Sequence, residues 1–156
     1  MGLGLLLACN EDTSSTPVTD AQACTALGSA VGVAGLAAPY GSPPAPVLVA
    51  SSASRYDLTL PASPAPGAYS GIVRWQVSQP GQYGIYAAPS ITFLVRDESS
   101  AIMPFLKSLG SALSCDSIGR HVFLELPVGS YTVELGPSTR SDLRLVLLPV
   151  APGEEI

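Results

Sequence analysis

Glycine and proline interrupt this chain so often that long helices are disfavoured. Each occurs 15 times in 156 residues. Proline removes a backbone donor and fixes its φ angle, and glycine adds backbone freedom that regular structure must remove. Charged residues make up only 12% of the chain, so the lysine and glutamate of exposed helices are scarce. Frequent glycine and proline with few charged residues favour short strands joined by turns. The chain has the size of one domain.

From residue 47 onward, short runs of alternating apolar and polar residues predict half-buried strands. In Arg55–Leu60, for example, Tyr56, Leu58 and Leu60 fall on one face. The segment 101–113 is ambiguous and reads either as a short strand near Met103 or as a helical turn after Pro104. The other strands expected are Ile72–Val77, Gln82–Ala87, Ile91–Arg96, Arg120–Leu126, Ser130–Leu135 and Asp142–Val150. Their spacing, with turn residues between them, predicts an all-β fold, an antiparallel, jelly-roll-like β-sandwich of about eight to nine strands.

Before this series, a short N-terminal helix or irregular segment is expected. Asp20 is a candidate N-cap for a brief helix that runs to about Leu27. An apolar strand or loop would then continue to Ala38. Residues 39–46 contain four prolines, which favour an extended connector.

Two segments share one sequence pattern. The first reads Trp75-x-Val77-x-x-Pro80-Gly81-x-Tyr83-x-Ile85, and the second reads Leu124-x-Leu126-Pro127-x-Gly129-x-Tyr131-x-Val133. Both predict a hairpin with a Pro/Gly turn, in which glycine permits positive φ and the tyrosine packs against the neighbouring strand. This pattern resembles that of bacterial pre-peptidase C-terminal domains, which are small jelly-roll-like sandwiches. The resemblance covers residues 55–150. The resemblance implies an accessory domain that stabilises or presents a partner enzyme.

The N-terminus resembles the lipobox of bacterial lipoproteins. The run Gly4-Leu5-Leu6-Leu7-Ala8-Cys9 is apolar and ends in a small residue before cysteine. The resemblance implies removal of the preceding peptide and lipidation of Cys9, which would become a palmitate-bearing membrane anchor. It departs from the family at Leu7, where a small residue is usual, and no basic residue precedes the apolar run. A start codon assigned too far downstream accounts for the missing part, and the alternative is a short buried strand with an unmodified Cys9.

The domain organisation follows from these assignments. We expect a truncated signal peptide at 1–8 and, at 9–20, a lipid anchor with a polar, acidic tether that cannot bury enough surface to fold. An N-terminal appendage and connector occupy 21–46, the sandwich occupies 47–151, and a tail follows at 152–156. The chain also resembles uncharacterised lipoproteins of myxobacterial type, a likeness to which no activity is attached.

Assigning Cys9 to lipid leaves Cys24 and Cys115, which can close one disulfide. That pairing implies an oxidising compartment. The lipobox resemblance implies the bacterial cell envelope, with an outer-membrane anchor and a periplasmic or surface-facing body. The alternative is a cytosolic protein with two buried free thiols. No metal site is expected, because His121 is the only histidine and zinc and copper sites need several such ligands.

Several functions are disfavoured by composition. A net charge of −5 with one lysine and six scattered arginines opposes nucleic-acid binding. No unbroken apolar run is long enough for a membrane-spanning helix. Neither a Gly-x-Ser-x-Gly elbow nor a phosphate-binding loop occurs. A single histidine inside a strand is more often structural than catalytic, so we expect no enzyme.

Two binding hypotheses remain. Calcium accepts oxygen ligands from loops, and the candidate ligands are Asp97, Glu98 and Asp116, although no dense ligand run is present. A carbohydrate could stack on Trp75, Tyr69 or Tyr86 if these side chains formed an exposed row, whereas the alternative is that they pack inside the sandwich. We expect an envelope-anchored, non-catalytic binding or structural module, with an unidentified protein or glycan partner.

Overall fold

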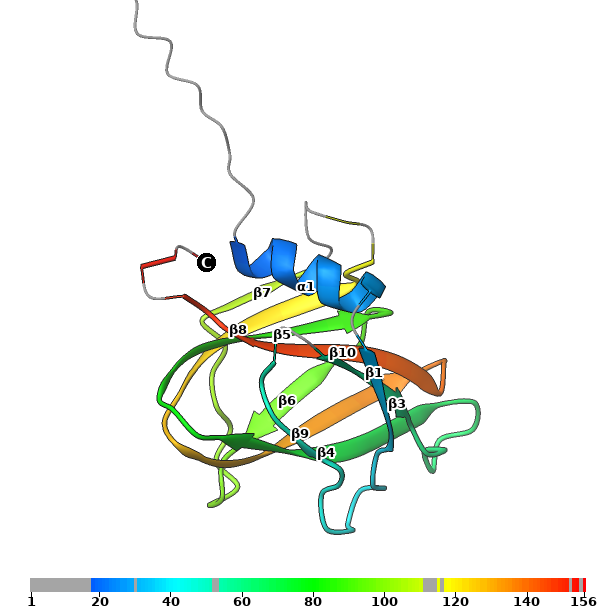
Figure 1. Ribbon diagram of the computed structural model, residues 1–156. Coiled ribbons are helices and arrows are strands. Elements are labelled where there is room, and N and C mark those ends of the chain that lie inside the picture. Colours follow the sequence, from blue (N-terminus) through cyan, green and yellow to red (C-terminus); the bar gives the residue numbers. More distant parts are fainter. Residues whose placement is uncertain are drawn as a thin grey trace, which may run out of the picture.

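The computed structural model describes residues 18–29, 31–51, 54–110, 115, 117–151, 153–154 and 156. In this part of the chain, two β-sheets pack face to face, and one helix lies on the outer face of the larger sheet (Figure 1). The predicted all-β sandwich with a short N-terminal helix is therefore confirmed. Among the described residues, no helix has the length and apolar character needed to cross a bilayer.

The larger sheet has six strands in the order β1-β3-β10-β5-β8-β7, and the smaller has four in the order β2-β4-β9-β6. The elements are α1 (Val18–Ser29), β1 (Val31–Leu36), β2 (Val47–Leu48), β3 (Ser54–Thr59), β4 (Tyr69–Val77), β5 (Gly81–Ala88), β6 (Phe93–Arg96), β7 (Lys107–Leu109), β8 (Arg120–Leu126), β9 (Gly129–Ser138) and β10 (Asp142–Pro149). Most neighbours are antiparallel, but β1 pairs with β3 and β2 pairs with β4 in parallel.

The strand predictions hold for the regular part of the series. The seven expected strands correspond to β3, β4, β5, β6, β8, β9 and β10, with ends shifted by a few residues. The ambiguous segment forms strand structure: Ile102 makes an isolated bridge with Arg96, and β7 follows at 107–109. The apolar stretch after the helix forms β1, at one edge of the six-stranded sheet.

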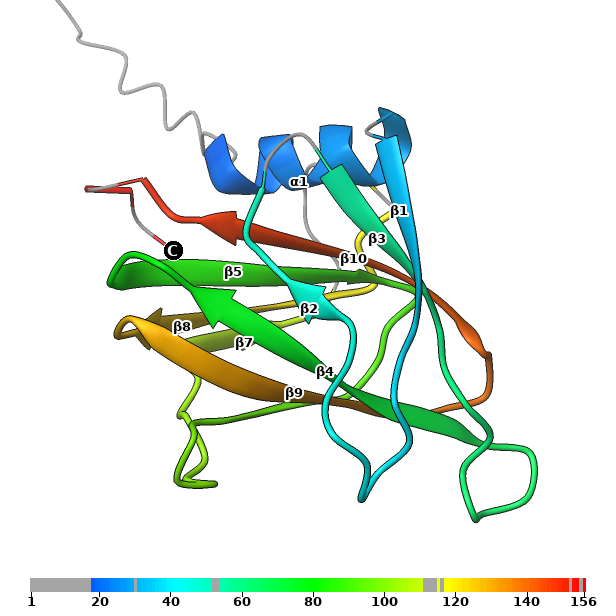
Figure 2. The same ribbon diagram turned by 60° about the horizontal axis from the view of Figure 1, so that its bottom comes forward.

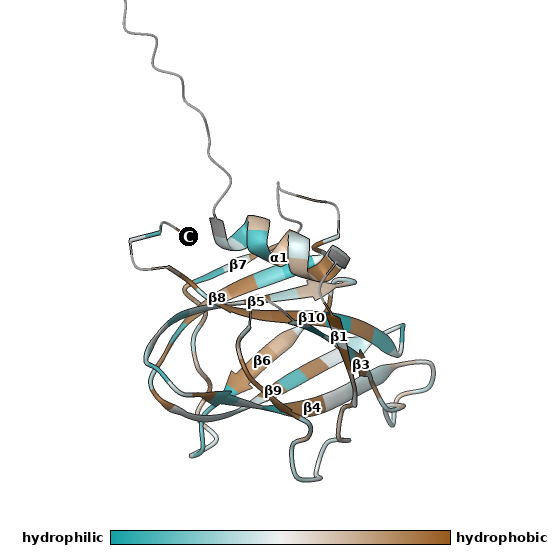
Figure 3. Cartoon of the chain, in the orientation of Figure 1, coloured by the Kyte–Doolittle hydropathy of each residue, from teal (hydrophilic) through white to brown (hydrophobic). Residues whose placement is uncertain are grey.

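The main core lies between the two sheets, where the inward-facing residues of the alternating strands meet. Trp75 is completely buried there, and its ring makes an edge-to-face contact with Tyr83, with centroids 5.4 Å apart. Trp75 is thus the core aromatic, not a ligand platform. Along β9 in Figure 3, apolar (brown) and polar (teal) positions follow one another, as expected of a strand with one buried face.

The two Pro/Gly segments are not hairpins, and that prediction is wrong. β4 belongs to the smaller sheet and β5 to the larger, so the turn between them crosses from one sheet to the other. The turn from β8 to β9 crosses back in the same way. Within the sheets, β4 pairs with β9 and β5 pairs with β8. The alternation that suggested hairpins reflects burial against the opposite sheet.

The shared Gly-x-Tyr element has a structural reason at these crossings. The Tyr83 hydroxyl donates to the carbonyl of Gln79 at 2.5 Å, and the Tyr131 hydroxyl donates to the carbonyl of Pro127 at 2.7 Å. Each tyrosine is nearly buried at the start of its strand and bonds the main chain four residues earlier. A buried phenol needs such an acceptor, so each tyrosine ties its strand to the preceding turn.

Helix α1 covers strands of the larger sheet on the face away from the main core (Figure 2). It begins at Val18, so Asp20 lies in its first turn and is not the N-cap that the sequence suggested. A second apolar cluster fills the space under the helix: Ala23, Ala26, Leu27, Tyr86, Ala88, Ile118, Phe123, Val146, Leu148 and Val150. At the helix C-terminus, the carbonyl of Leu27 accepts hydrogen bonds from Arg55 and Arg144, which satisfy a free helix carbonyl and complement its dipole.

Candidate functional site

The disulfide joins the helix to the sandwich. Cys24 on α1 is bonded to Cys115, which precedes β8, with their Cα atoms 6.0 Å apart. The predicted pairing of these two cysteines is present, across a separation of 91 residues. Disulfides persist in oxidising compartments, so the bond indicates an extracytoplasmic location. The predicted lipidation residue, Cys9, lies outside the described residues.

A buried polar cluster lies beside the disulfide, under the first turn of α1. The Tyr86 hydroxyl donates to Oδ1 of Asp20 at 2.6 Å. The His121 ring stacks on the Tyr86 ring, with centroids 5.4 Å apart, and its Nε2 lies 4.0 Å from Oδ2 of Asp20. His121 Nδ1 is 3.0 Å from the carbonyl oxygen of Gly110. Because a carbonyl only accepts, this contact makes Nδ1 the donor.

This cluster holds the helix in place. Tyr86 and His121 are almost completely removed from solvent, so no substrate reaches them without displacing α1. Burial and the neighbouring Asp20 carboxylate raise the pKa of the Tyr86 phenol above its ordinary value. The phenol therefore stays protonated and donates to Asp20. At the same end of the helix, the Thr19 backbone N–H donates to Glu154 at 2.7 Å, and the Thr19 hydroxyl donates to the same carboxylate.

Sequence reasoning did not identify this cluster as a unit. The signal was present in β5, where Tyr83, Ile85 and Ala87 point to one face and Tyr86 to the other. Nothing in the local pattern showed that a helix covers that second face. The sequence suggested a structural role for His121, and its ring is buried and hydrogen-bonded to the carbonyl of Gly110.

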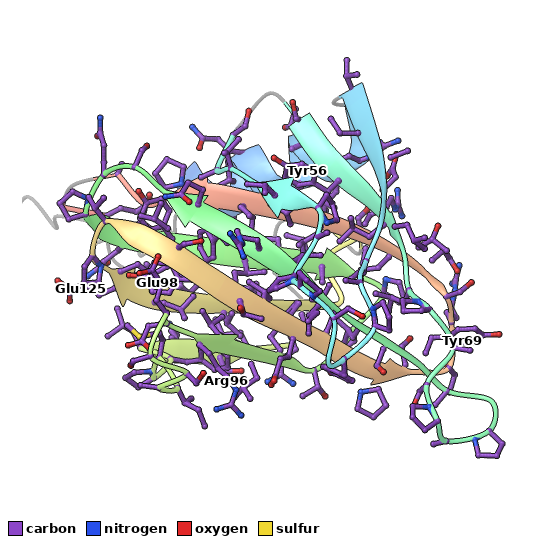
Figure 4. The ribbon with its side chains drawn as sticks, turned by 90° about the horizontal axis from the view of Figure 1, so that it is seen from below. Tyr56, Tyr69, Arg96, Glu98 and Glu125 are labelled. Carbon is purple, nitrogen blue, oxygen red and sulfur yellow. A yellow bond between two sulfur atoms is a disulfide. The ribbon has the colours of Figure 1, made fainter. Side chains whose placement is uncertain are left out.

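The two candidate stacking tyrosines are not brought together. Tyr69 is the first residue of β4 in the smaller sheet and is half-buried, whereas Tyr86 lies in the larger sheet under α1. Figure 4 shows Tyr69 at one end of the sandwich, beside a long loop. Tyr69 and Tyr86 therefore form no exposed aromatic row, the arrangement that carbohydrate stacking would require, because Tyr86 is fully buried.

Three pockets lined by described residues lie at the opposite end of the sandwich. We call it the turn end: residues 76–82, 97–103, 127–131, 149–151 and 153–154. One of these pockets has a volume of about 580 Å³ and is lined by Gln79, Pro80, Gly81, Gln82, Tyr83, Pro149, Val150, Ala151, Gly153 and Glu154. A pocket of about 190 Å³ adjoins it and shares Gln79, Tyr83 and Pro149. The lining of the two pockets includes the amide side chains of Gln79 and Gln82 and the rings of Pro80 and Pro149.

Asp97 and Glu98 border a third pocket of about 350 Å³ at the turn end, beside Pro127 and Val128. Figure 4 labels Glu98 at this end of the sandwich. Asp97 Oδ1 accepts hydrogen bonds from the Ser99 N–H, the Ser99 hydroxyl and the Ala101 N–H, at 2.9, 2.7 and 2.9 Å. These donors lower the pKa of the Asp97 carboxyl, the Ser99 hydroxyl most. Asp97 thus shapes its own loop.

Calcium binding gains no support from this geometry. In the part of the chain that the structure describes, no group of three or more acidic, histidine or cysteine side chains converges as a metal site. Asp116, the third candidate ligand, lies outside the described residues.

Comparison with known proteins identifies no family. No protein-family model matches this sequence, and no curated protein matches it either. The structure shows a two-sheet β-sandwich with a disulfide between Cys24 and Cys115.

Proposed function

We propose that this protein is an envelope-anchored lipoprotein whose sandwich acts as a non-catalytic binding module. Cys9 carries the lipid, and residues 10–17 form the tether that links it to α1. The observation that carries the proposal is the Cys24–Cys115 disulfide, which fits an oxidising envelope compartment and leaves Cys9 as the remaining cysteine of the three.

The position of α1 supports the anchoring role. The helix is the first described element after the tether, and a disulfide, the Asp20–Tyr86 bond and the arginine contacts to Leu27 fasten it to the larger sheet. Because these contacts hold α1 on the sandwich, a force on the tether does not detach the helix. A tether of eight residues spans at most about 28 Å, so it keeps the sandwich close to the membrane.

The binding surface that we propose is the turn end. Thr19, at the start of α1, bonds Glu154 in the wall of the pocket of about 580 Å³, so the first turn of the helix lies beside this surface (Figure 1). Gln79 and Gln82 offer both donors and acceptors, and the proline rings offer apolar faces. Such a surface suits a neutral, hydroxyl-rich ligand near the membrane, the chemistry of an envelope glycan.

The lipid anchor is tested by labelling. Cells expressing the chain with its native upstream region are grown with radiolabelled palmitate, beside cells that express the Cys9→Ser variant. We expect label and membrane association in the parent and neither in the variant. A Cys24→Ser variant is the matched control, because it removes a different cysteine and should keep the label. Equal labelling of the parent and the Cys9→Ser variant would remove the anchor from the proposal.

The binding surface is tested with purified peptidoglycan and soluble neutral oligosaccharides as probes. The Gln79→Ala/Gln82→Ala variant should lose co-sedimentation or binding that the parent shows. Arg140→Ala/Asp142→Ala serves as the control, since it removes an exposed ion pair at the opposite end of the sandwich. Binding that both variants retain, or that the parent lacks for every probe, refutes a glycan site at the turn end.

A further inference from the structure

Strand β1 is an unprotected sheet edge. It is the outermost strand of the six-stranded sheet, and among the described strands its one partner is β3 (Figure 2). Its sequence, VGVAGL, has no charge and no proline. An edge strand presents a row of unpaired N–H and C=O groups, and proteins usually blunt such edges with charges, prolines, bulges or short length.

The other three sheet edges show that protection. β7 is three residues long and begins with Lys107. β2 is two residues long. β6 ends in Arg96, and the chain that follows folds back on it, with the Met103 N–H bonded to the carbonyl of Val95. β1 differs from all three, since it is six residues long, uncharged and regular. This contrast indicates that β1 is covered when the protein functions.

The surface around β1 is apolar as well. Val31 is 75% exposed and Val33 is 45% exposed. Exposed apolar side chains continue along the segment that connects β1 to β2 and beyond it: Leu36, Tyr40, Val47 and Val49. Exposed apolar side chains along an edge strand and the connection that follows it make this side a candidate interaction surface.

Charge favours a second copy of this chain as the partner. The molecule carries a net charge of −5, so two copies repel one another over most of their surface. No charged residue lies between Asp20 and Arg55 in the sequence. On the neighbouring strand, Arg55 and Asp57 neutralise each other in an ion pair of 3.0 Å. This side is therefore the one on which two identical copies meet without repulsion.

We propose that β1 pairs antiparallel with β1 of a second copy about a twofold axis, which joins the two six-stranded sheets into one. Such an interface is isologous, so each strand supplies the edge that the other lacks. A stable interface uses roughly 20 residues on each side, about the length of the segment from Val31 to Val49.

The test is the mass in solution of the full chain carrying Cys9→Ser, measured by light scattering after gel filtration over a wide range of concentrations. We expect a dimer. Val33→Lys places a charge beside the twofold axis and should raise the dimer dissociation constant by about tenfold or more. Val128→Lys is the matched control: Val128 is 59% exposed, lies at the turn end, and its substitution should leave the dimer intact.

Circular dichroism is the control for folding, and we expect the spectrum of Val33→Lys to match that of the parent. Hydrogen exchange supplies an independent measurement on the unsubstituted edge: amides of residues 31–36 should gain protection as the concentration rises, while those of β7 should not. A monomer at all concentrations overturns the proposal. So does a dimer that Val33→Lys leaves intact, or one that Val128→Lys disrupts equally.

Discussion

Removing the Cys24–Cys115 disulfide is expected to destabilise the protein strongly. The bond closes a loop of 91 residues, and the chain-entropy relation gives about 4.6 kcal/mol for a loop of that length at 25 °C. A domain of this kind has a total free energy of unfolding of about 5–15 kcal/mol. The disulfide would thus contribute a third or more of the total, by restricting the unfolded chain.

The assay is urea unfolding followed by the fluorescence of Trp75, the single tryptophan, which is buried between the sheets. The parent is the Cys9→Ser chain, measured with and without reductant, beside its Cys24→Ala/Cys115→Ala derivative. Both the reduced parent and the derivative should lose about 4–5 kcal/mol relative to the oxidised parent. A loss below about 1 kcal/mol would refute the reasoning, since the loop would then be closed by other contacts in the unfolded state.

Three further predictions concern tyrosine hydroxyls and their partners. Tyr83→Phe and Tyr131→Phe should each lower the free energy of unfolding, measured by urea unfolding, by about 1 kcal/mol. Tyr40→Phe is the control, because it loses only a 3.5 Å contact. It should change the free energy of unfolding by less than about 0.5 kcal/mol. Asp20→Asn removes the charged acceptor of the Tyr86 hydroxyl and should cost about 1.5–3 kcal/mol, seen as faster hydrogen exchange in α1. Folding raises the pKa of Tyr86, so the free energy of unfolding should fall as pH rises above about 10. Tyr86→Phe should reduce the slope of the free energy of unfolding against pH by about 1.4 kcal/mol per pH unit. An unchanged slope would contradict the raised pKa.

Strand positions were predictable because alternation records burial against the main core. In β5 the residues Tyr83, Ile85 and Ala87 were assigned to one face, and all three belong to the core between the sheets. The same pattern misplaced Tyr86 as a candidate ligand contact. Its face of the strand is covered by α1, which comes from a distant part of the sequence. Local periodicity carries no information about which element covers the second face of a strand.

Strand pairing was less predictable than strand position. The Pro/Gly turns near Gly81 and Gly129 were recognised as chain reversals, yet a turn sequence does not state whether the next strand joins the same sheet or the opposite one. The parallel pairing of β1 with β3 joins strands across a long connection and leaves no local signature. The disulfide pairing was predictable, because once Cys9 was assigned to lipid only two cysteines remained.

The most direct test of this account is the alkylation state of the three cysteines in protein isolated from the producing cells. The intact protein is alkylated before and after reduction, and the modified residues are identified by mass spectrometry. The account predicts no alkylation before reduction and alkylation of Cys24 and Cys115 alone afterwards, with Cys9 blocked by lipid throughout. Alkylation of Cys9, or of Cys24 and Cys115 without reduction, would contradict it.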